Sequence, residues 1–441
     1  MRSLKRYLLR FYPKGHNLRY ENQEGPETQA LGRAASRCRR RGKDGPMKQR
    51  LDYMDFCRAF LMLLGIPYRA GQVFGPDPWV VNPVTTSVLL GHVNDVIHAF
   101  RMPAFFLLAG FFSLLVIRKA GLVAWLKARL ARLGLPLLVS VVLLNIPAMY
   151  VASVALHPAV GVAPSFLAQI TSPGGHWLGH LWFLLDLLLM CGLLAALLPL
   201  RRLAPAPLER LAGGVLSSDL LLVALMVAWR LGLKALDERL LGGHLERAFG
   251  DTVNLRELLL YFPFFLLGTW LLARPEAFER FTRPGRGTLL LFTAGLGLLL
   301  LQRHVEQGAV TQVSGVLLFA LMGLTGARLL LALARRLVHA GHPVVNELVR
   351  SAFTIYLFHY LVVMLVAEGS IRLGLDRPLL GWAIAVAAGL GVSYLIHRFV
   401  IGRSPWLLWL FNGIPLSRTR PGLAGQAAPM VAPLSHSLRI G

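Results

Sequence analysis

The stretch that decides the fold is NDVIHAFRMPAFFLLAGFFSLLVI, residues 94–117, which is predominantly apolar. A helix needs ~20 predominantly apolar residues to cross the ~30 Å hydrocarbon core of a bilayer, and this stretch is long enough. The whole chain of 441 residues is 55% hydrophobic and only 15% charged, which is far too apolar for an ordinary soluble domain. The sequence therefore predicts an all-α integral membrane protein.

Further apolar segments lie on both sides of this stretch. Together they predict about ten transmembrane helices, and an even number places both termini on the same side of the membrane. The expected spans lie near 52–69, 94–117, 134–156, 180–200, 218–235, 256–273, 287–302, 312–332, 351–367 and 379–399.

The distribution of lysine and arginine predicts the orientation of these spans. Basic residues gather before the first span and in alternate loops, as in RKAGLVAWLKARLAR at 118–132, whereas the loops 70–93 and 157–179 contain none. Because cytoplasmic loops carry the excess of basic residues, both termini are expected in the cytoplasm (N-in/C-in). The loop at 230–256 is an exception, since its five basic residues lie on the expected outer side, diluted by four acidic residues.

The formal net charge of +24 has the same explanation. The basic residues lie in short clusters between apolar segments, so we interpret them as topology signals and expect no nucleic-acid partner. The three cysteines, Cys38, Cys57 and Cys191, are widely spaced and predict neither a disulfide framework nor a zinc site.

The apolar segments define one transmembrane domain with two polar ends. Residues 1–49 are basic and contain no signal-peptide core, so they are expected to form a disordered cytoplasmic extension. The transmembrane domain is expected over 50–413, and a disordered tail over 414–441. Met47 stands just before the first span, so a translation start there, instead of at Met1, is an open alternative.

The ionisable side chains inside the spans are the candidates for function. Such a group at membrane depth is costly unless it faces protein or water. In the second span Asp95, His98 and Arg101 recur every three residues and form one polar stripe. A carboxylate beside an imidazole can fix its tautomer, and a guanidinium can hold an anion. The alternative is a buried ion-pair cluster that only joins helices.

The first span carries an arginine at each end. Arg58 and Arg69 are eleven residues apart, so they lie on one helix face, ~16 Å apart along the axis. Arg58 is near the cytoplasmic end, where Asp55 is a possible partner one turn earlier. Arg69 is near the outer end, on the same side of the membrane as His98, and snorkelling to the headgroups is its alternative explanation.

The fourth and ninth spans also contain polar groups. His180 and Trp182 begin the fourth span at the outer interface, and Asp186 lies about 9 Å deeper by helical rise. Trp182 taken alone is typical of an aromatic belt. Tyr356 and His359 lie one turn apart in the ninth span, and a lone buried histidine is often a core residue with satisfied hydrogen bonds.

Lys127, Arg129 and Arg132 lie at the expected cytoplasmic mouth of the third span. Their charge can attract a phosphate-rich ligand, although topology signalling explains them equally well. Together with the polar groups of the other spans, they outline a path across the membrane. Such a path fits an enzyme that takes an activated donor from the cytoplasm, and it also fits a carrier without chemistry.

Several longer motifs follow one another along the chain. They are LDYMDFCRAFLMLLGIPYRAGQVF, NDVIHAFRMPAFFLLAGFF, RLARLGLPLL, HLWFLLDLL, YFPFFLLG, TIYLFHYLVV and SPWLLWLFNG. In order and spacing they resemble the membrane acyltransferase-3 family, and most closely its branch that succinylates periplasmic glucans. The resemblance covers about 50–413. The resemblance implies a ten-helix enzyme of the bacterial inner membrane that moves an acyl group, succinyl in that branch, from cytoplasmic acyl-CoA to hydroxyls of a periplasmic glucan or related polysaccharide, with no bound cofactor or metal.

One departure from the family concerns the catalytic base. The resemblance implies an arginine in the first span followed eleven residues later by a histidine that serves as the base, but here Arg58 is followed by Arg69. A guanidinium stays protonated at neutral pH and does not accept a proton. Three outcomes follow: His98 acts as the base with Asp95 orienting it, the protein is an inactive relative, or it uses another acyl group or acceptor.

The expected site therefore has three parts. The catalytic candidates are His98, Asp95 and Arg69. The substrate-binding candidates are Arg58, Arg101, His180, Trp182, Asp186, Tyr356 and His359. The candidates for binding acyl-CoA are Lys127, Arg129 and Arg132.

Overall fold

The computed structural model is helical throughout the part of the chain it describes. Within that part it forms no strand beyond an isolated bridge between Ala248 and Val253. The described residues are 46–83, 85–156, 162–172, 174–200, 219–306, 308–338 and 342–416. The expected extension and tail fall almost entirely outside them, as does Cys38, whereas Cys57 and Cys191 are buried and free.

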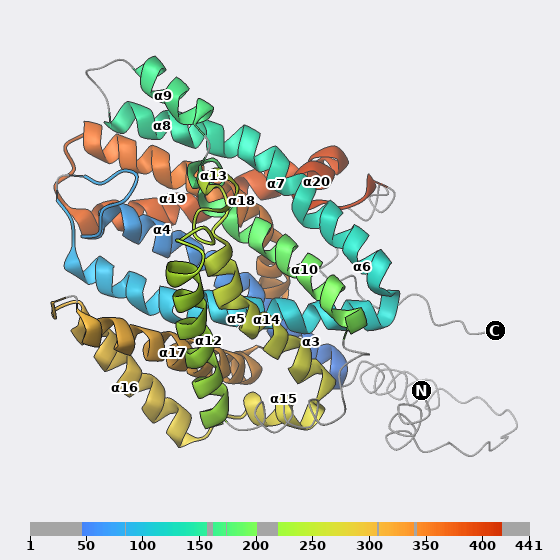
Figure 1. Cartoon of the computed structure of the whole chain (residues 1–441). Coiled ribbons are helices and arrows are strands. Elements are labelled where there is room, and N and C mark those ends of the chain that lie inside the picture. The colour runs from blue at the N-terminus through green and yellow to red at the C-terminus, as the bar shows by residue number, and fades with distance from the viewer. Residues whose placement is uncertain are drawn as a thin grey trace, which may run out of the picture. The chain divides into compact units, whose positions relative to one another are not determined.

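Every one of the ten expected segments contains a helix (Figure 1). The first is divided into α3 (Pro46–Leu63) and α4 (Gly65–Phe74). The third combines α6 (Leu122–Arg129), η1 (Leu130–Gly134), α7 (Leu135–Ser140), η2 (Val141–Asn145) and α8 (Ile146–Leu156). The others are α5 (Val88–Ala120), α10 (Trp182–Leu200), α12 (Asp219–Arg239), α14 (Leu255–Ala273), α16 (Arg286–Gln302), α17 (Ala309–Leu337), α18 (Pro343–Arg372) and α19 (Pro378–Phe399).

Short helices connect or flank these longer helices. They are α9 (Val162–Thr171), η3 (Gly175–Trp177), η4 (Gly179–Leu181), α13 (Ala248–Asp251), α15 (Pro275–Phe281), η6 (Ile401–Arg403) and α20 (Pro405–Asn412). Proline marks the start of two long helices: Pro343 lies in the first turn of α18 and Pro378 in the first turn of α19. Proline is tolerated there because the N–H groups of the first turn have no acceptor within the helix.

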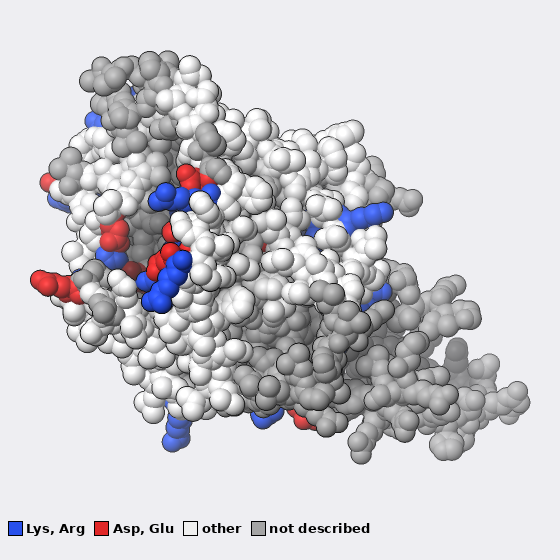
Figure 2. Space-filling model, in the orientation of Figure 1, with Lys and Arg blue, Asp and Glu red and all other residues white. Residues whose placement is uncertain are grey.

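Seven helical stretches among the described residues are long and apolar enough to cross a membrane, and the pair α15 and α16, bent by 57°, would make an eighth. The chain is therefore a multi-pass membrane protein. The helix α3 does not qualify alone because its first half is rich in charged residues, and α12 has charged residues toward its end. Figure 2 agrees with a lipid-exposed surface, since most described residues in view are uncharged and the charged ones gather mainly around a hollow.

The long helix α5 is central and packs against α14, α17 and α4. Two glycines let α5 and α14 approach backbone to backbone. A Cβ atom on Gly110 would lie 1.9 Å from the carbonyl oxygen of Phe265, and one on Gly268 would lie 1.8 Å from that of Leu107. Close packing of this kind is what holds helices together in a bilayer, where lipid and side chains are equally apolar.

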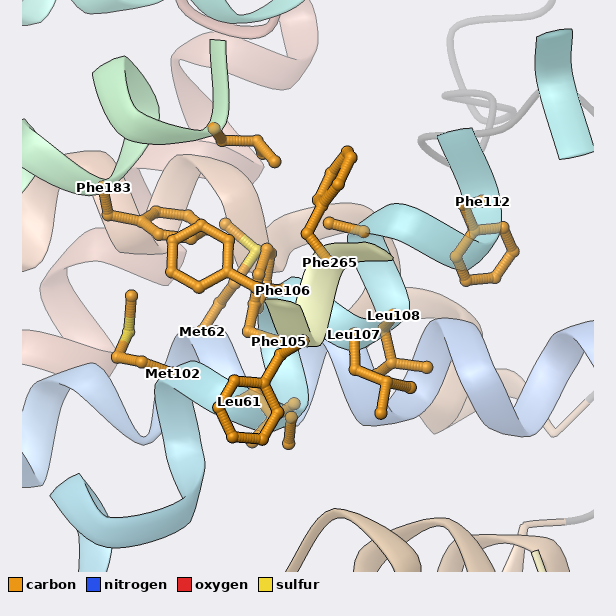
Figure 3. Close-up of a cluster of buried hydrophobic side chains, with 14 of the residues drawn as sticks. Leu61, Met62, Met102, Phe105, Phe106, Leu107, Leu108, Phe112, Phe183 and Phe265 are labelled. Atoms are coloured by element: carbon orange, nitrogen blue, oxygen red, sulfur yellow. The ribbon is translucent and has the colours of Figure 1, made fainter. Parts of the chain in front are cut away.

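Aromatic side chains fill the space between α5 and α10 (Figure 3). Phe183 contacts Phe105 and Phe106, with ring centroids 4.5 and 5.4 Å apart. Met62 of α3 lies beside them. This apolar cluster forms one wall of the cavity that holds the candidate site.

Candidate active site

Polar residues from four of the expected spans meet in one cavity, which we call the central cavity. Its residues come from α3, α4, α5, η4, the start of α10 and α18. They are Leu61, Met62, Gly65, Arg69, Arg101, Met102, Phe105, His180, Trp182, Phe183, Tyr356 and His359. One wall is thus apolar and the other carries two guanidinium and two imidazole groups, a combination typical of a substrate pocket.

Tyr356 and His180 hold the two histidine-bearing elements together. The Tyr356 hydroxyl donates to the backbone carbonyl of His180 at 2.6 Å. In return, Nε2 of His180 donates to the backbone carbonyl of Tyr356 at 3.1 Å. The reciprocal pair fixes η4, the short turn directly before α10, against the middle of α18, although the two residues are 176 positions apart in the chain.

Both cavity histidines have a defined tautomer. His359 donates through Nδ1 to the Tyr356 carbonyl at 2.6 Å, the same oxygen that accepts from His180. A neutral imidazole that donates through one nitrogen carries a lone pair on the other. In the described part of the chain, those other nitrogens, Nδ1 of His180 and Nε2 of His359, have no hydrogen-bond partner. The two rings are close, with centroids 5.1 Å apart.

The two cavity arginines are set among aromatic rings. Arg101 is buried, and its guanidinium carbon lies 4.8 Å from the ring centroid of Tyr68. Arg69 donates to Oε1 of Gln72 at 2.7 Å. Its guanidinium carbon lies 5.9 Å, 5.9 Å and 6.0 Å from the rings of Tyr68, Trp79 and Tyr360. Cation–π contacts of this kind hold a guanidinium without neutralising its charge, so both arginines can still attract an anion.

Gly65 leaves a gap between a cation and an imidazole. A Cβ atom at this position would lie 2.9 Å from Nη1 of Arg101 and 4.0 Å from Nε2 of His359. The two nitrogens therefore flank the same point of the cavity. Gly65 was not predicted from the sequence, because a glycine in an apolar helix gives no local sign of which residues face it.

His98 is not among the residues that line the central cavity. Its ring stacks on Tyr68 at 5.8 Å, and its Nδ1 lies 3.4 Å from the Tyr68 hydroxyl. The structure does not join Asp95 to His98 as expected, because Arg303 binds both Asp95 oxygens, through Nε at 2.7 Å and Nη2 at 2.9 Å. A guanidinium that engages both carboxylate oxygens forms a stronger contact than an imidazole on one of them.

Arg303 follows α16 and was not identified from the sequence. It also donates to both carboxylate oxygens of Asp77, at 3.0 and 2.9 Å, so it ties the loop before α5 to α5 itself. The hydrogen bonds to Asp95 and then to Asp77 raise the pKa of Arg303 above its usual range. Its partners lie more than two hundred residues away, which no local pattern reveals.

Asn145, at the end of the π-helical segment η2, was also missed. Its side chain is buried and donates through Nδ2 to the backbone carbonyls of Trp177 at 3.1 Å and Leu178 at 2.6 Å. It therefore supports the turn that leads to His180. A π-helical segment shifts the helix face by one residue, and such segments are common at functional sites.

Arg58 lies outside the central cavity. Its Nη1 contacts Oδ1 of Asp55 at 3.3 Å, which confirms the expected partner, and its guanidinium carbon lies 4.7 Å from the ring of Phe112. It also interacts electrostatically with Arg129 and Arg132. These three arginines form a separate cationic group, in which Arg129 is buried and Arg132 half-buried, while Lys127 is exposed.

Asp186 also lies outside the residues that line the cavity, whereas Trp182, one turn earlier on α10, lines it. Asp186 is buried and interacts electrostatically with Glu257 of α14. No group of three His, Cys, Asp or Glu side chains in the described ranges could hold a metal ion.

Comparison with known proteins decides the family. Residues 51–398 match a family model described as Acyltransferase domain. This chain belongs to the acyltransferase-3 family. The resemblance inferred from the motifs is thereby confirmed, and so is the prediction that the protein is an enzyme that transfers acyl groups.

The acyltransferase is similar to curated proteins over most of its length. It is 28% identical to the glucans biosynthesis protein C of Salmonella gallinarum over 372 residues, and 28% identical to that of Salmonella heidelberg over 371 residues. Each match covers 82% of this chain and 94% of the relative. No solved structure matches the acyltransferase.

Proposed function

We propose that this acyltransferase moves an acyl group, succinyl, from cytoplasmic acyl-CoA to hydroxyls of a periplasmic glucan. It would do so as a ten-helix, N-in/C-in protein of the bacterial inner membrane. Two of its relatives are named for glucan biosynthesis, and together with the family they support this class of acceptor.

The observation that carries the proposal is the polar wall of the central cavity. Acyl transfer to a hydroxyl needs a proton acceptor for the incoming alcohol and a cation for the oxyanion that forms at the thioester carbonyl. The cavity provides the lone pairs of His180 and His359 beside the guanidinium groups of Arg69 and Arg101. A carrier without chemistry has no need for unpartnered imidazole nitrogens, so the geometry favours the enzyme over that alternative.

The donor and the acceptor would reach the cavity from opposite sides. On the cytoplasmic side, the phosphates of acyl-CoA would meet Arg129, Arg132 and Lys127, with Arg58 behind them. On the outer side, the hollow surrounded by charged residues in Figure 2 is a candidate entrance for the sugar. Within the cavity, Arg69 would bind the succinyl carboxylate, and Trp182 and Tyr356 would contact the substrates.

The catalytic base has two candidate locations, the position of His98 and the central cavity. His98 was expected from the sequence, with Asp95 to orient it. The cavity histidines are better placed, because they line the space where substrates would meet, whereas Asp95 is bound to Arg303 and His98 contacts Tyr68. Asp186 is a proposed substrate-binding residue that would act from beside the cavity through α10.

Reconstituted protein and a doubly labelled donor test this function. Proteoliposomes would receive succinyl-CoA with one label in the succinyl group and another in the adenine ring, with glucan on the opposite side of the membrane. We expect the succinyl label to appear on the glucan as a base-labile ester while the adenine label stays behind as free CoA. Transfer of both labels without an ester would identify a carrier, and no movement of either label would identify an inactive relative.

A further inference from the structure

We propose that His359 is the proton acceptor for the attacking hydroxyl and that Arg101 stabilises the oxyanion in the same step. The inference rests on the proposed function and deepens it, because it assigns the reacting atoms within the central cavity. Neither residue occupies the position of the histidine that the family resemblance implies in the first span.

The tautomer of His359 prepares it to accept a proton. Its Nδ1 donates to the Tyr356 carbonyl at 2.6 Å, which leaves the lone pair on Nε2. Nε2 is buried and has no hydrogen-bond partner in the described part of the chain. A buried polar atom without a partner is unfavourable because it has lost its hydrogen bonds to water, so an unpartnered nitrogen on a cavity wall points to a ligand hydroxyl that donates to it.

The position of Gly65 distinguishes His359 from His180. The point 2.9 Å from Nη1 of Arg101 is also 4.0 Å from Nε2 of His359, so base and cation face the same small volume. His180 instead stacks its ring on Tyr360, with centroids 4.8 Å apart and planes inclined by 25°. Its second nitrogen has no hydrogen-bond partner in the described part of the chain, but its main contacts hold η4 against α18.

The reaction balances with these groups alone. The glucan hydroxyl gives its proton to Nε2 of His359 as its oxygen forms a bond to the thioester carbonyl carbon. Negative charge develops on the carbonyl oxygen, which faces the Arg101 guanidinium. The C–S bond then breaks as the C=O bond re-forms, and the thiolate takes the proton from the His359 imidazolium. The products are the ester and CoA thiol.

The test uses a substitution that keeps the structural hydrogen bond and removes the base. In His359→Asn the side-chain amide can donate to the Tyr356 carbonyl in place of Nδ1, but it has no lone pair at the position of Nε2. We expect a loss in kcat of roughly 10²–10⁴-fold, as for removal of a general base. The binding of succinyl-CoA and the melting temperature should stay close to those of the wild type.

The matched control is His397→Asn on α19. His397 is a buried histidine whose Nδ1 lies 2.9 Å from the hydroxyl of Thr354, and it is not among the residues that line the central cavity. Full activity in this variant would show that the loss in His359→Asn does not come from disturbing a buried imidazole in general.

Other outcomes would overturn the inference. If His359→Asn keeps wild-type kcat while His180→Gln or His98→Ala abolishes transfer, His359 is not the base. The base is then His180 or His98, whichever substitution abolishes transfer. Carbethoxylation by diethyl pyrocarbonate, mapped by mass spectrometry, adds a readout of the free Nε2 lone pair. His359 should be modified in wild-type protein and protected by succinyl-CoA. A wild type that transfers no acyl group would overturn the proposed function, and this inference with it.

Discussion

Arg69 shows how one residue changes the interpretation of a whole site. Family resemblance implies a histidine base at this position, and an arginine there left open whether the protein is active. The structure places Arg69 on the cavity wall among three aromatic rings, with its Nη1 bonded to Gln72. These contacts support a role for Arg69 in binding an anion, whereas proton transfer is proposed for His359.

Exchanging Arg69 for histidine tests that role. We expect Arg69→His to lower kcat/KM for succinyl-CoA by roughly 10–150-fold, because a charge-assisted hydrogen bond to a carboxylate contributes about 1.5–3 kcal/mol. Acetyl-CoA, which has no carboxylate on its acyl group, should lose much less. Arg69→Lys keeps the positive charge, so its kcat/KM for succinyl-CoA should lie between those of the wild type and Arg69→His. A large gain in rate with histidine would instead identify a degenerate enzyme in which Arg69 only replaced the base.

Gly65 offers a second prediction at this scale. The Cβ of Gly65→Ala would lie 2.9 Å from Nη1 of Arg101 and 4.0 Å from Nε2 of His359. We therefore expect acyl transfer to fall by about 10²-fold, the effect of misplacing reacting groups by ~1 Å. The control is Gly192→Ala on α10, where nothing lies within 4 Å of the added atom. Equal activity of both variants would contradict the proposed reacting volume. Fluorescence-detected gel filtration of each variant would confirm that it is folded.

At the scale of elements, helix identity was predictable and helix contacts were not. Each long apolar segment of the sequence contains a helix, since the length needed to cross a bilayer is a local property of the sequence. No local pattern predicts the irregular segment η2 or the close approach of α5 and α14. Both involve backbone that is distant in the sequence: Asn145 donates to the carbonyl of Leu178, and Gly268 lies against the carbonyl of Leu107.

The contact of α5 with α14 can be tested directly. We expect Gly268→Ala to lower the thermal stability of the protein in detergent, because the new Cβ would lie 1.8 Å from a backbone oxygen and the helices would have to separate. Overpacking of this kind costs about 1–3 kcal/mol. Gly297→Ala on α16, with nothing within 4 Å of its Cβ, should not lower stability. If both variants melt at the wild-type temperature, the helices do not approach as closely as described.

At the scale of the whole molecule, the proposed orientation follows from charge bias alone. Single cysteines can test it: Thr86→Cys lies in an expected outer loop and Arg336→Cys in an expected cytoplasmic one, and both positions are exposed. With Cys38 replaced by serine, the native thiols left are Cys57 and Cys191, which are buried. A membrane-impermeant maleimide should label position 86 in spheroplasts and position 336 only after permeabilisation. The opposite pattern would invert the topology.

The sequence by itself determined the class of the protein and which residues are candidates for its chemistry. Composition and apolar segments specified a helical membrane protein, motifs specified the family, and ionisable residues at membrane depth identified Arg69, Arg101, His180 and His359 as candidates. These are local properties, because the bilayer imposes the same length and polarity rules on each span separately.

Only the tertiary structure decided which candidates share a cavity. Arg58 lies in α3 outside the cavity, whereas Arg69 lies in α4 on its wall. Arg303 binds the carboxylate of Asp95, and His180 and His359 both donate to the backbone carbonyl of Tyr356 on α18. The physical reason is that hydrogen bonds and packing contacts act over a few ångströms, between residues that can lie more than two hundred positions apart in the chain. Periodicity along the chain does not reveal such partners.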